Sequence, residues 1–220
     1  MASAAPAIAS SNAMSAKIGG MTHQHDHDAE HHEHHHHHEH VDYGDAVQAF
    51  RADKDEYFRT SPGSPLPVAE RGDFGGLPYF PVDEALRLER LTLEPYAGNE
   101  PTSFQIPTSD GKLKPAERAG TFHFDVQGVP CSLTAYTFEG NSAESVFVPF
   151  LDRTSGKESY GAGRYLDLDR DGDGTYTIDF NLAYHPSCVY DIKFSCPLTP
   201  RENRLPIRIL AGERLEPIAD

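Results

Sequence analysis

The most concentrated chemistry in the sequence is a run of histidines near the N-terminus. Residues 23–40 read HQHDHDAEHHEHHHHHEH, and eleven of these 18 residues are His. Neutral imidazole binds Zn, Ni and Cu, and the acidic residues between the histidines add charge and oxygen ligands. The pattern predicts a tail that captures divalent transition metal ions, with an engineered tag or a solubilising segment as the alternatives. The candidate metal ligands are His23, His25, His27, His31, His32, His34, His35, His36, His37, His38 and His40.

A second set of polar residues follows the apolar segments of the C-terminal half. Arg164 opens one such segment, and its guanidinium carries the parallel donors that hold a carboxylate or a phosphate. The set predicts either a pocket for a small anionic ligand or a structural network that pairs Arg164 with Asp179 and fixes the loop CPLTPREN. The candidate ligand-binding residues are Arg164, Asp179, Asn181, Tyr184, Glu202 and Asn203.

An acidic turn, DRDGDGTYTIDF, spans residues 169–180. Asp169, Asp171 and Asp173 have the spacing of the first calcium ligands of an EF-hand loop. The twelfth position is Phe180 instead of the bidentate Glu, and the flanking segments have the pattern of strands. We therefore expect a charged, glycine-containing turn, with a weak Ca²⁺ site as the alternative.

Three cysteines are the remaining candidates for reactive or metal-binding side chains. An odd number of cysteines argues against a secreted disulfide scaffold. His185, Cys188 and Cys196 form H-x2-C-x7-C, which lacks the C-x2-C pairs typical of structural zinc sites. Three interpretations stay open: a zinc site that also uses Cys131, a disulfide or close thiol pair between Cys188 and Cys196, and plain packing of buried thiols. Cys188 with His185 as its base is also a candidate nucleophile.

The elements that must position these residues are predicted from hydrophobic periodicity. Residues 45–58 form a helix with Asp45 as its N-cap, and the prolines of TSPGSPLP end it. A β-bulge would explain the leucines that are out of phase in the first strand, and the acidic turn would join a β-hairpin. Strands are predicted at 86–93, 121–126, 131–138, 145–151, 163–169, 175–182 and 205–212. The predicted fold is an all-β, antiparallel sandwich or barrel with one N-terminal helix.

Length, charge and composition bound the organisation and the partners. The 220 residues divide into a tail, 1–40, predicted to be disordered, and a single β domain, 41–220. The net charge of −15 disfavours nucleic acid and anionic membrane surfaces as partners. No apolar run is long enough to span a membrane and no signal peptide is evident, so we expect a cytoplasmic protein.

Several long strings resemble the DUF1684 family of prokaryotic proteins. They are FRADKDEYFRTSPGSPLP, FGGLPYFPVD, FVPFLDRTSGKESYGAGRYLDL and DFNLAYHPSCVYDIKFSCPLTPRENRLPIRILAGE. The resemblance covers about 45–215, and the His-rich tail lies outside it. The family's function is unknown, so the resemblance implies domain boundaries and no reaction. We therefore expect a binding protein, with an enzyme that uses the same pocket or a structural or interaction domain as the alternatives.

Overall fold

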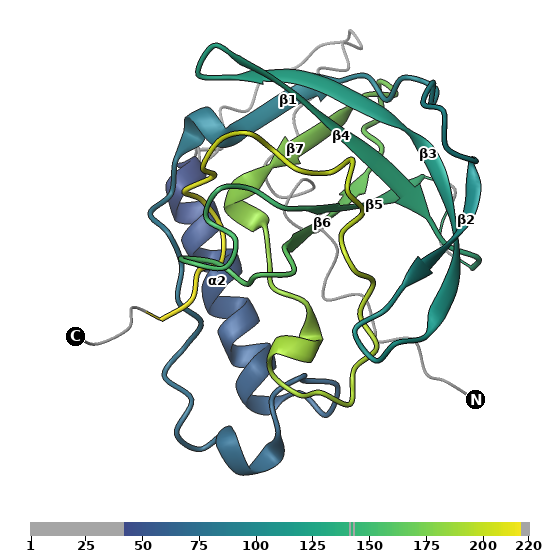
Figure 1. Ribbon diagram of the computed structural model, residues 1–220. Helices are drawn as coiled ribbons and strands as arrows, with labels where there is room; N and C mark the ends of the chain where they lie inside the picture. Colours follow the sequence, from purple (N-terminus) through teal and green to yellow (C-terminus); the bar gives the residue numbers. More distant parts are fainter. Residues whose placement is uncertain (1–41, 141, 143, 217–220) are drawn as a thin grey trace, which may run out of the picture.

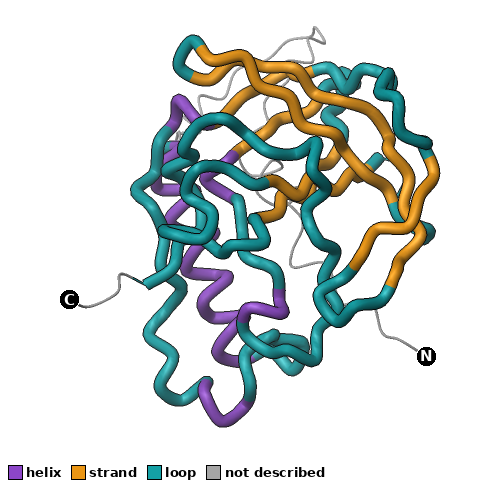
Figure 2. Tube along the Cα trace, in the orientation of Figure 1, coloured by secondary structure: helices purple, strands orange, loops and turns teal. Residues whose placement is uncertain are grey.

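The computed structural model describes residues 42–140, 142 and 144–216. Within these residues the chain forms one α-helix and seven strands, which belong to two antiparallel sheets (Figures 1 and 2). The predicted class, antiparallel β with one N-terminal helix, is confirmed. The His-rich tail, and with it the predicted metal ligands, lies outside the described residues. No helix in the described part of the chain is long and apolar enough to cross a membrane.

The α-helix, α2, spans Tyr43–Thr60 and begins earlier than predicted. Its N-cap is Asp42, whose side chain accepts a hydrogen bond from the Gly44 amide at 2.9 Å, while the predicted cap Asp45 lies in the first turn. The helix ends at Thr60, immediately before the proline-rich segment, as predicted. Its buried face carries two cations, Arg51 and Lys54, beside Val47 and Phe58.

Five strands form the larger sheet, in the order β2-β3-β4-β5-β6. A two-residue turn at Gln127 and Gly128 joins β3 to β4, and both residues have positive φ, 55° and 80°. This conformation matches the right-handed twist of a hairpin, and the long β3–β4 hairpin crosses the top of Figure 1. The strands are β2 (Ser103–Pro107), β3 (Leu113–Val126), β4 (Val129–Thr137), β5 (Ser145–Phe150) and β6 (Arg164–Asp169).

An irregularity in β3 divides the sheet between two hydrophobic clusters. The register with β4 shifts between Arg118 and Gly120, as in a β-bulge. A Cβ at Gly120 would lie 2.4 Å from the Glu94 carbonyl oxygen, so this close approach requires glycine. On one side of the shift Phe122 belongs to the main core, and on the other Tyr136, the partner of Arg118, belongs to a separate aromatic cluster.

The smaller sheet pairs β1 (Arg87–Leu91) with β7 (Tyr176–Asp179). The register shifts between Leu88 and Leu91, which confirms the predicted bulge in this strand. The main core includes Phe122, Leu133, Val148, Phe150, Leu166 and Leu168 from the large sheet, with Ile178 and Phe180 from the β7 segment. Four short 3₁₀ helices complete the described elements: Val68–Glu70, Glu84–Leu86, Phe180–Leu182 and Ser187–Val189.

The predicted hairpin around the acidic turn is wrong, although the turn itself is tight. A single bridge, Arg170 to Tyr176, links the two segments before they diverge into different sheets. Leu166 and Ile178 belong to one core although their strands lie in different sheets, so the chain crosses that core after the turn. The predicted strand 175–182 also ends at Asp179, because the Asp179 side chain accepts from the Asn181 amide and caps a 3₁₀ helix.

The predicted last strand, 205–212, is also wrong. These residues form bends and irregular structure and are partly buried, but they form no strand of either sheet. Leu205, Ile209 and Ala211 contribute to the main core, which explains the apolar pattern that suggested a strand. The carbonyl groups of Ile209 and Ala211 accept hydrogen bonds from the Arg164 side chain instead of from a neighbouring strand.

Candidate functional site

Arg164, the residue expected to hold an anion, is fully buried in a network within the protein. Its Nη1 donates to the carbonyl oxygens of Ala211 at 2.5 Å and Glu213 at 3.1 Å, and its Nη2 donates to that of Ile209 at 2.8 Å. Its acidic partner is Asp152, at 3.5 Å, rather than Asp179. Burial lowers the pKa of the guanidinium, and Asp152 opposes that shift. Only Nε lacks a partner among the described residues, so Arg164 fastens the C-terminal segment to β6.

Asp179 and Asn181 contact Tyr43, the first residue of α2, instead of Arg164. The Tyr43 hydroxyl donates to Asp179 Oδ2 at 2.7 Å and accepts from Asn181 Nδ2 at 3.0 Å. Asn181 also donates to the Asp83 carbonyl at 2.8 Å and accepts from its amide at 2.9 Å. Burial raises the pKa of Asp179, while the hydrogen bond from Tyr43 acts in the opposite direction. These contacts join the helix, the loop before β1 and the end of β7.

Asn203 and Glu202 hold the loop that follows the two C-terminal cysteines. Asn203 is fully buried; its Oδ1 accepts from the Thr134 amide at 2.8 Å, and its Nδ2 donates to two backbone carbonyls at 2.7 Å. Glu202 Oε1 accepts from Arg118 Nε at 2.9 Å and from the Tyr136 hydroxyl at 3.0 Å. Both residues therefore satisfy polar groups of the large sheet, as the structural interpretation expects.

The acidic turn and the H-x2-C-x7-C residues do not gather as metal ligands. Asp173 accepts from the Thr175 amide at 3.0 Å and supports the turn that Gly174 closes with φ of 88°. Across the residues that the structure describes, no three His, Cys, Asp or Glu side chains form a group that could hold a metal ion. The structure thus brings together neither the calcium candidates, Asp169, Asp171 and Asp173, nor a zinc set on Cys188 and Cys196.

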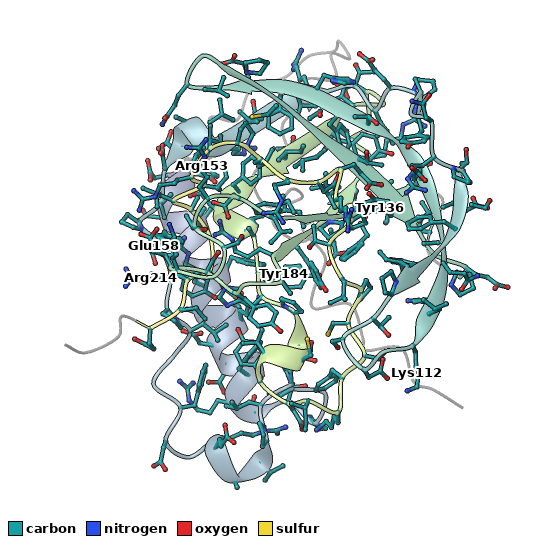
Figure 3. All side chains as sticks on the ribbon, in the orientation of Figure 1. Lys112, Tyr136, Arg153, Glu158, Tyr184 and Arg214 are labelled. Atoms are coloured by element: carbon teal, nitrogen blue, oxygen red, sulfur yellow. The ribbon has the colours of Figure 1, made fainter. Side chains whose placement is uncertain are left out.

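Tyr184 differs from the other predicted residues, because it belongs to a partly open aromatic surface. We call this cluster the aromatic cleft, because two of its rings, those of Phe104 and Phe138, line the cavity described below, while Tyr136, Phe147 and Tyr165 are buried. Its side chains belong to one cluster that includes Cys188 and Cys196 and lies apart from the main core. Three of the rings, those of Phe104, Phe138 and Tyr184, are only half-buried. The aromatic cleft consists of Phe104, Tyr136, Phe138, Phe147, Tyr165 and Tyr184, of which Tyr136 and Tyr184 are labelled in Figure 3.

One tilted and two edge-to-face contacts join the rings of the cleft in succession. The ring centroids of Phe138 and Phe147 are 5.5 Å apart, those of Phe147 and Tyr165 4.7 Å, and those of Tyr165 and Tyr184 5.7 Å. Backbone hydrogen bonds between Tyr165 and Tyr184 place the latter beside the edge strand β6. Such contacts stabilise the arrangement beyond the area they bury. The positions of the rings therefore do not depend on a ligand.

A cavity of about 590 Å³ opens where the cleft meets β2, β3 and β4. Phe104, Ala116 and Phe138 supply its apolar wall, and Glu117 and Glu139 supply carboxylates. The volume falls within the range of small-molecule sites. The remaining lining residues are Ser103, Gln105, Pro115 and Thr137.

Asp167 adds a carboxylate to the aromatic cleft, and the sequence analysis did not single it out. Its Oδ2 accepts a hydrogen bond of 2.6 Å from the Tyr184 hydroxyl. The residue is exposed; desolvation raises the pKa of its carboxyl group, and the hydrogen bond from Tyr184 acts in the opposite direction. The alternation of RYLDLD, with Leu166 and Leu168 in the core, places Asp167 on the cleft side and could have identified it.

A buried polar cluster beneath Tyr184 was also missed. Lys54 Nζ lies 2.6 Å from Glu213 Oε1 and 4.8 Å from the centroid of the Tyr184 ring. Glu213 Oε2 accepts from the His185 amide at 2.6 Å and from the Tyr190 hydroxyl at 3.1 Å. Burial opposes ionisation of Glu213, but Lys54 and His185 outweigh it and hold the pKa of this carboxyl below its usual value. Burial also lowers the pKa of His185 to about 4.

The fold and the cleft define an antiparallel β protein with one N-terminal helix and an aromatic cleft against the larger sheet. Residues 72–214 match the family model described as "Protein of unknown function (DUF1684)", and the chain belongs to that family. The match begins later than the expected residue 45, so the helix precedes it.

A solved structure shares this architecture. It is the solution NMR structure of the uncharacterized protein from gene locus rrnAC0354 of Haloarcula marismortui. The two chains are 40% identical, with a TM-score of 0.57, and the comparison covers 77% of this chain and 92% of the other. No curated protein matches this chain.

Proposed function

We propose that this protein binds a small molecule in the aromatic cleft. The observation that carries the proposal is the cavity of about 590 Å³ walled by Phe104 and Phe138, which continues into a partly open aromatic surface. A buried, fully packed core would leave no such space, whereas ligand sites combine an apolar wall with a few polar groups. The carboxylates of Glu117 and Glu139 supply those groups at the cavity, and the Asp167–Tyr184 pair lies at the adjoining aromatic cluster.

The aromatic wall and the carboxylates of the cavity favour a neutral aromatic ligand or an organic cation. Such a ligand has to share the wall with two cations of the protein, because Lys114 Nζ lies 4.1 Å from the Phe138 ring centroid and Arg118 Cζ lies 4.0 Å from that of Phe104. Aromatic faces and carboxylates both attract cations, and the chain as a whole carries a net charge of −15. The anion expected at Arg164 would have to displace the contacts of that guanidinium to three backbone carbonyls. The proposed binding site therefore lies on the opposite side of the large sheet from Arg164.

A tryptophan reporter tests the proposal directly, because the natural sequence contains no Trp. In the full chain, Phe138→Trp places a single indole at the wall of the cavity and keeps an aromatic ring there. We expect phenyltrimethylammonium to change its fluorescence saturably at millimolar concentrations or below. The matched control is Leu113→Trp, at a position that is 64% exposed. A response that is equal in both variants, or that fails to saturate, would exclude a specific site in the cleft.

A second binding function, capture of transition metal ions, is proposed for the His-rich tail. Its support is the sequence alone: eleven histidines within 18 residues, interspersed with carboxylates. Because imidazole is a ligand that all three ions accept, we expect Zn²⁺, Ni²⁺ and Cu²⁺ all to bind. Metal binding by the tail and ligand binding by the cleft are independent parts of the proposal.

Calorimetric titration with ZnCl₂ and NiCl₂ tests the tail. The comparison is between the natural full chain and a full-chain variant in which the eleven tail histidines are replaced by Asn. We expect micromolar or tighter binding by the natural chain and its loss in the variant. Tight, stoichiometric binding by the variant would place the metal in the β domain and would support the alternative of a metal-dependent enzyme.

A further inference from the structure

Two free thiols meet at the edge of the aromatic cleft. Cys188 lies in the 3₁₀ helix Ser187–Val189, and Cys196 lies on the loop that follows it. The Cys188 amide donates to Cys196 Sγ at 3.3 Å, and both side chains belong to the same cluster. The third cysteine, Cys131, is buried in the main core and shares no cluster with them. The pair therefore forms within one short stretch of chain, residues 188–196.

The loop is fixed from outside the pair. The Cys196 amide donates to Ser109 Oγ at 3.0 Å, and the Ser109 amide donates to the Cys196 carbonyl at 2.8 Å. Cys196 is buried, whereas Cys188 is half-buried and so open to a small reagent. The two sulfur atoms therefore have different roles, because only the Cys188 sulfur can meet a reagent from solvent.

The hydrogen bonds around the pair favour a thiolate on Cys188. The neighbouring Cys196 side chain lowers the pKa of Cys188 to about 6, with smaller contributions from Ser109 and Tyr160, against the opposing effect of burial. The pKa of Cys196 is raised, first because its proton is held by Cys188. Burial raises the pKa of Cys131. Since thiolates are the nucleophilic form, Cys188 is the most reactive of the three cysteines.

We propose that Cys188 and Cys196 form a redox-active dithiol that reacts with small disulfides. The Cys188 thiolate attacks one sulfur of a disulfide R–S–S–R, forms a mixed disulfide and releases RS⁻. The Cys196 sulfur loses its proton to solvent and attacks the Cys188 sulfur, which releases the second RS⁻ and leaves a Cys188–Cys196 disulfide. The two protein thiols are oxidised and R–S–S–R is reduced to two thiols. This inference stands independently of a ligand in the cleft.

The test uses the reduced full chain and oxidised glutathione as the disulfide. After reaction, free thiols are alkylated in denaturant and the digest is mapped by mass spectrometry. We expect a Cys188–Cys196 disulfide in the natural chain, with Cys131 still free. In Cys196→Ser the reaction should stop at a glutathione mixed disulfide on Cys188. Cys131→Ser is the matched control and should behave as the natural chain does.

A pH series on the natural chain provides a second readout that needs no variant. Alkylation of native Cys188 by iodoacetamide should reach half its maximal rate near pH 6 and, at pH 7, exceed that of Cys131 at least about tenfold. Tyr160→Phe should move this midpoint upward, because one hydrogen bond to the thiolate is lost. A Cys188 that stays free with glutathione, a mixed disulfide that persists in the natural chain, or equal reactivity of Cys131 would each overturn the proposal.

Discussion

The two faces of β6 differ in character. One face carries the buried network around Arg164, and the other carries the aromatic cleft. Arg164, Leu166 and Leu168 alternate with Tyr165 and Asp167 along the same strand. The first set lies within the buried network and main core, whereas Tyr165 belongs to the cleft, where Asp167 is exposed. Polar groups of the network find partners inside the protein, while the cleft keeps aromatic surface beside a cavity. The network therefore serves stability, and the cleft is the site that we propose for binding.

Loss of Arg164 is expected to have the largest effect on stability. Arg164→Met leaves the Asp152 carboxylate buried beside a neutral side chain and deprives three backbone carbonyls of their donor. We expect the free energy of unfolding to fall by about 4 kcal/mol, measured by urea denaturation. The control is Arg208→Met, which removes an exposed pair with Glu158 and should cost far less, because solvent screens that pair. Equal effects in the two variants would contradict a structural role for the network.

Protonation of His185 should destabilise the same side of the molecule in acid. Its pKa is lowered from 6.5 to about 4 by burial, so the unfolded chain binds more protons between these values. The contribution is therefore complete above pH 6.5 and is lost as the pH falls towards 4, with a total of about 3 kcal/mol. His185→Asn should flatten the stability–pH curve in this window, while the exposed control His123→Asn should leave the slope unchanged. An unchanged slope in His185→Asn would show that other groups govern acid stability.

A smaller loss is expected where the helix joins β7. Tyr43→Phe removes the hydroxyl that donates to Asp179 and accepts from Asn181, and both partners are buried. We expect a decrease of about 1–2 kcal/mol in the free energy of unfolding, measured by urea denaturation. Tyr57→Phe, on the same helix, is the matched control. If Tyr43→Phe and Tyr57→Phe cost the same, the Tyr43 hydroxyl contributes nothing specific.

The cleft should show the smallest effect on stability and the largest on binding. Phe138 is half-buried, so Phe138→Ala should reduce the free energy of unfolding by only about 1 kcal/mol. Binding of phenyltrimethylammonium, followed by calorimetry on the full chain, should weaken at least about tenfold because the cavity loses an aromatic wall. Leu113→Ala serves as the control for binding. Unchanged affinity in Phe138→Ala would show that phenyltrimethylammonium does not bind in the cleft.

Local patterns predicted most of the elements. The helix, the bulge in β1 and the strands around β3 to β6 follow from periodicity, glycine and proline placement, which act within a few residues. The elements predicted wrongly were those whose partners are remote in the sequence. The segment 205–212 has strand-like alternation, but the carbonyls of Ile209 and Ala211 accept hydrogen bonds from Arg164. Among the predicted site residues, Tyr184 lies in the cleft, while Asp179, Asn181 and Asn203 fasten loops.

The sequence by itself determined the family and the antiparallel β class with its helix, because composition, motifs and short-range periodicity carry that information, and it alone supports the metal binding that we propose for the His-rich tail. Only the tertiary structure decided which side of β6 is closed, that Lys54 meets Glu213, and that Cys188 contacts Cys196 beside the cleft. The physical reason is that a buried polar group must find its partner wherever the chain brings one. Those partners come from distant segments whose meeting no local pattern encodes.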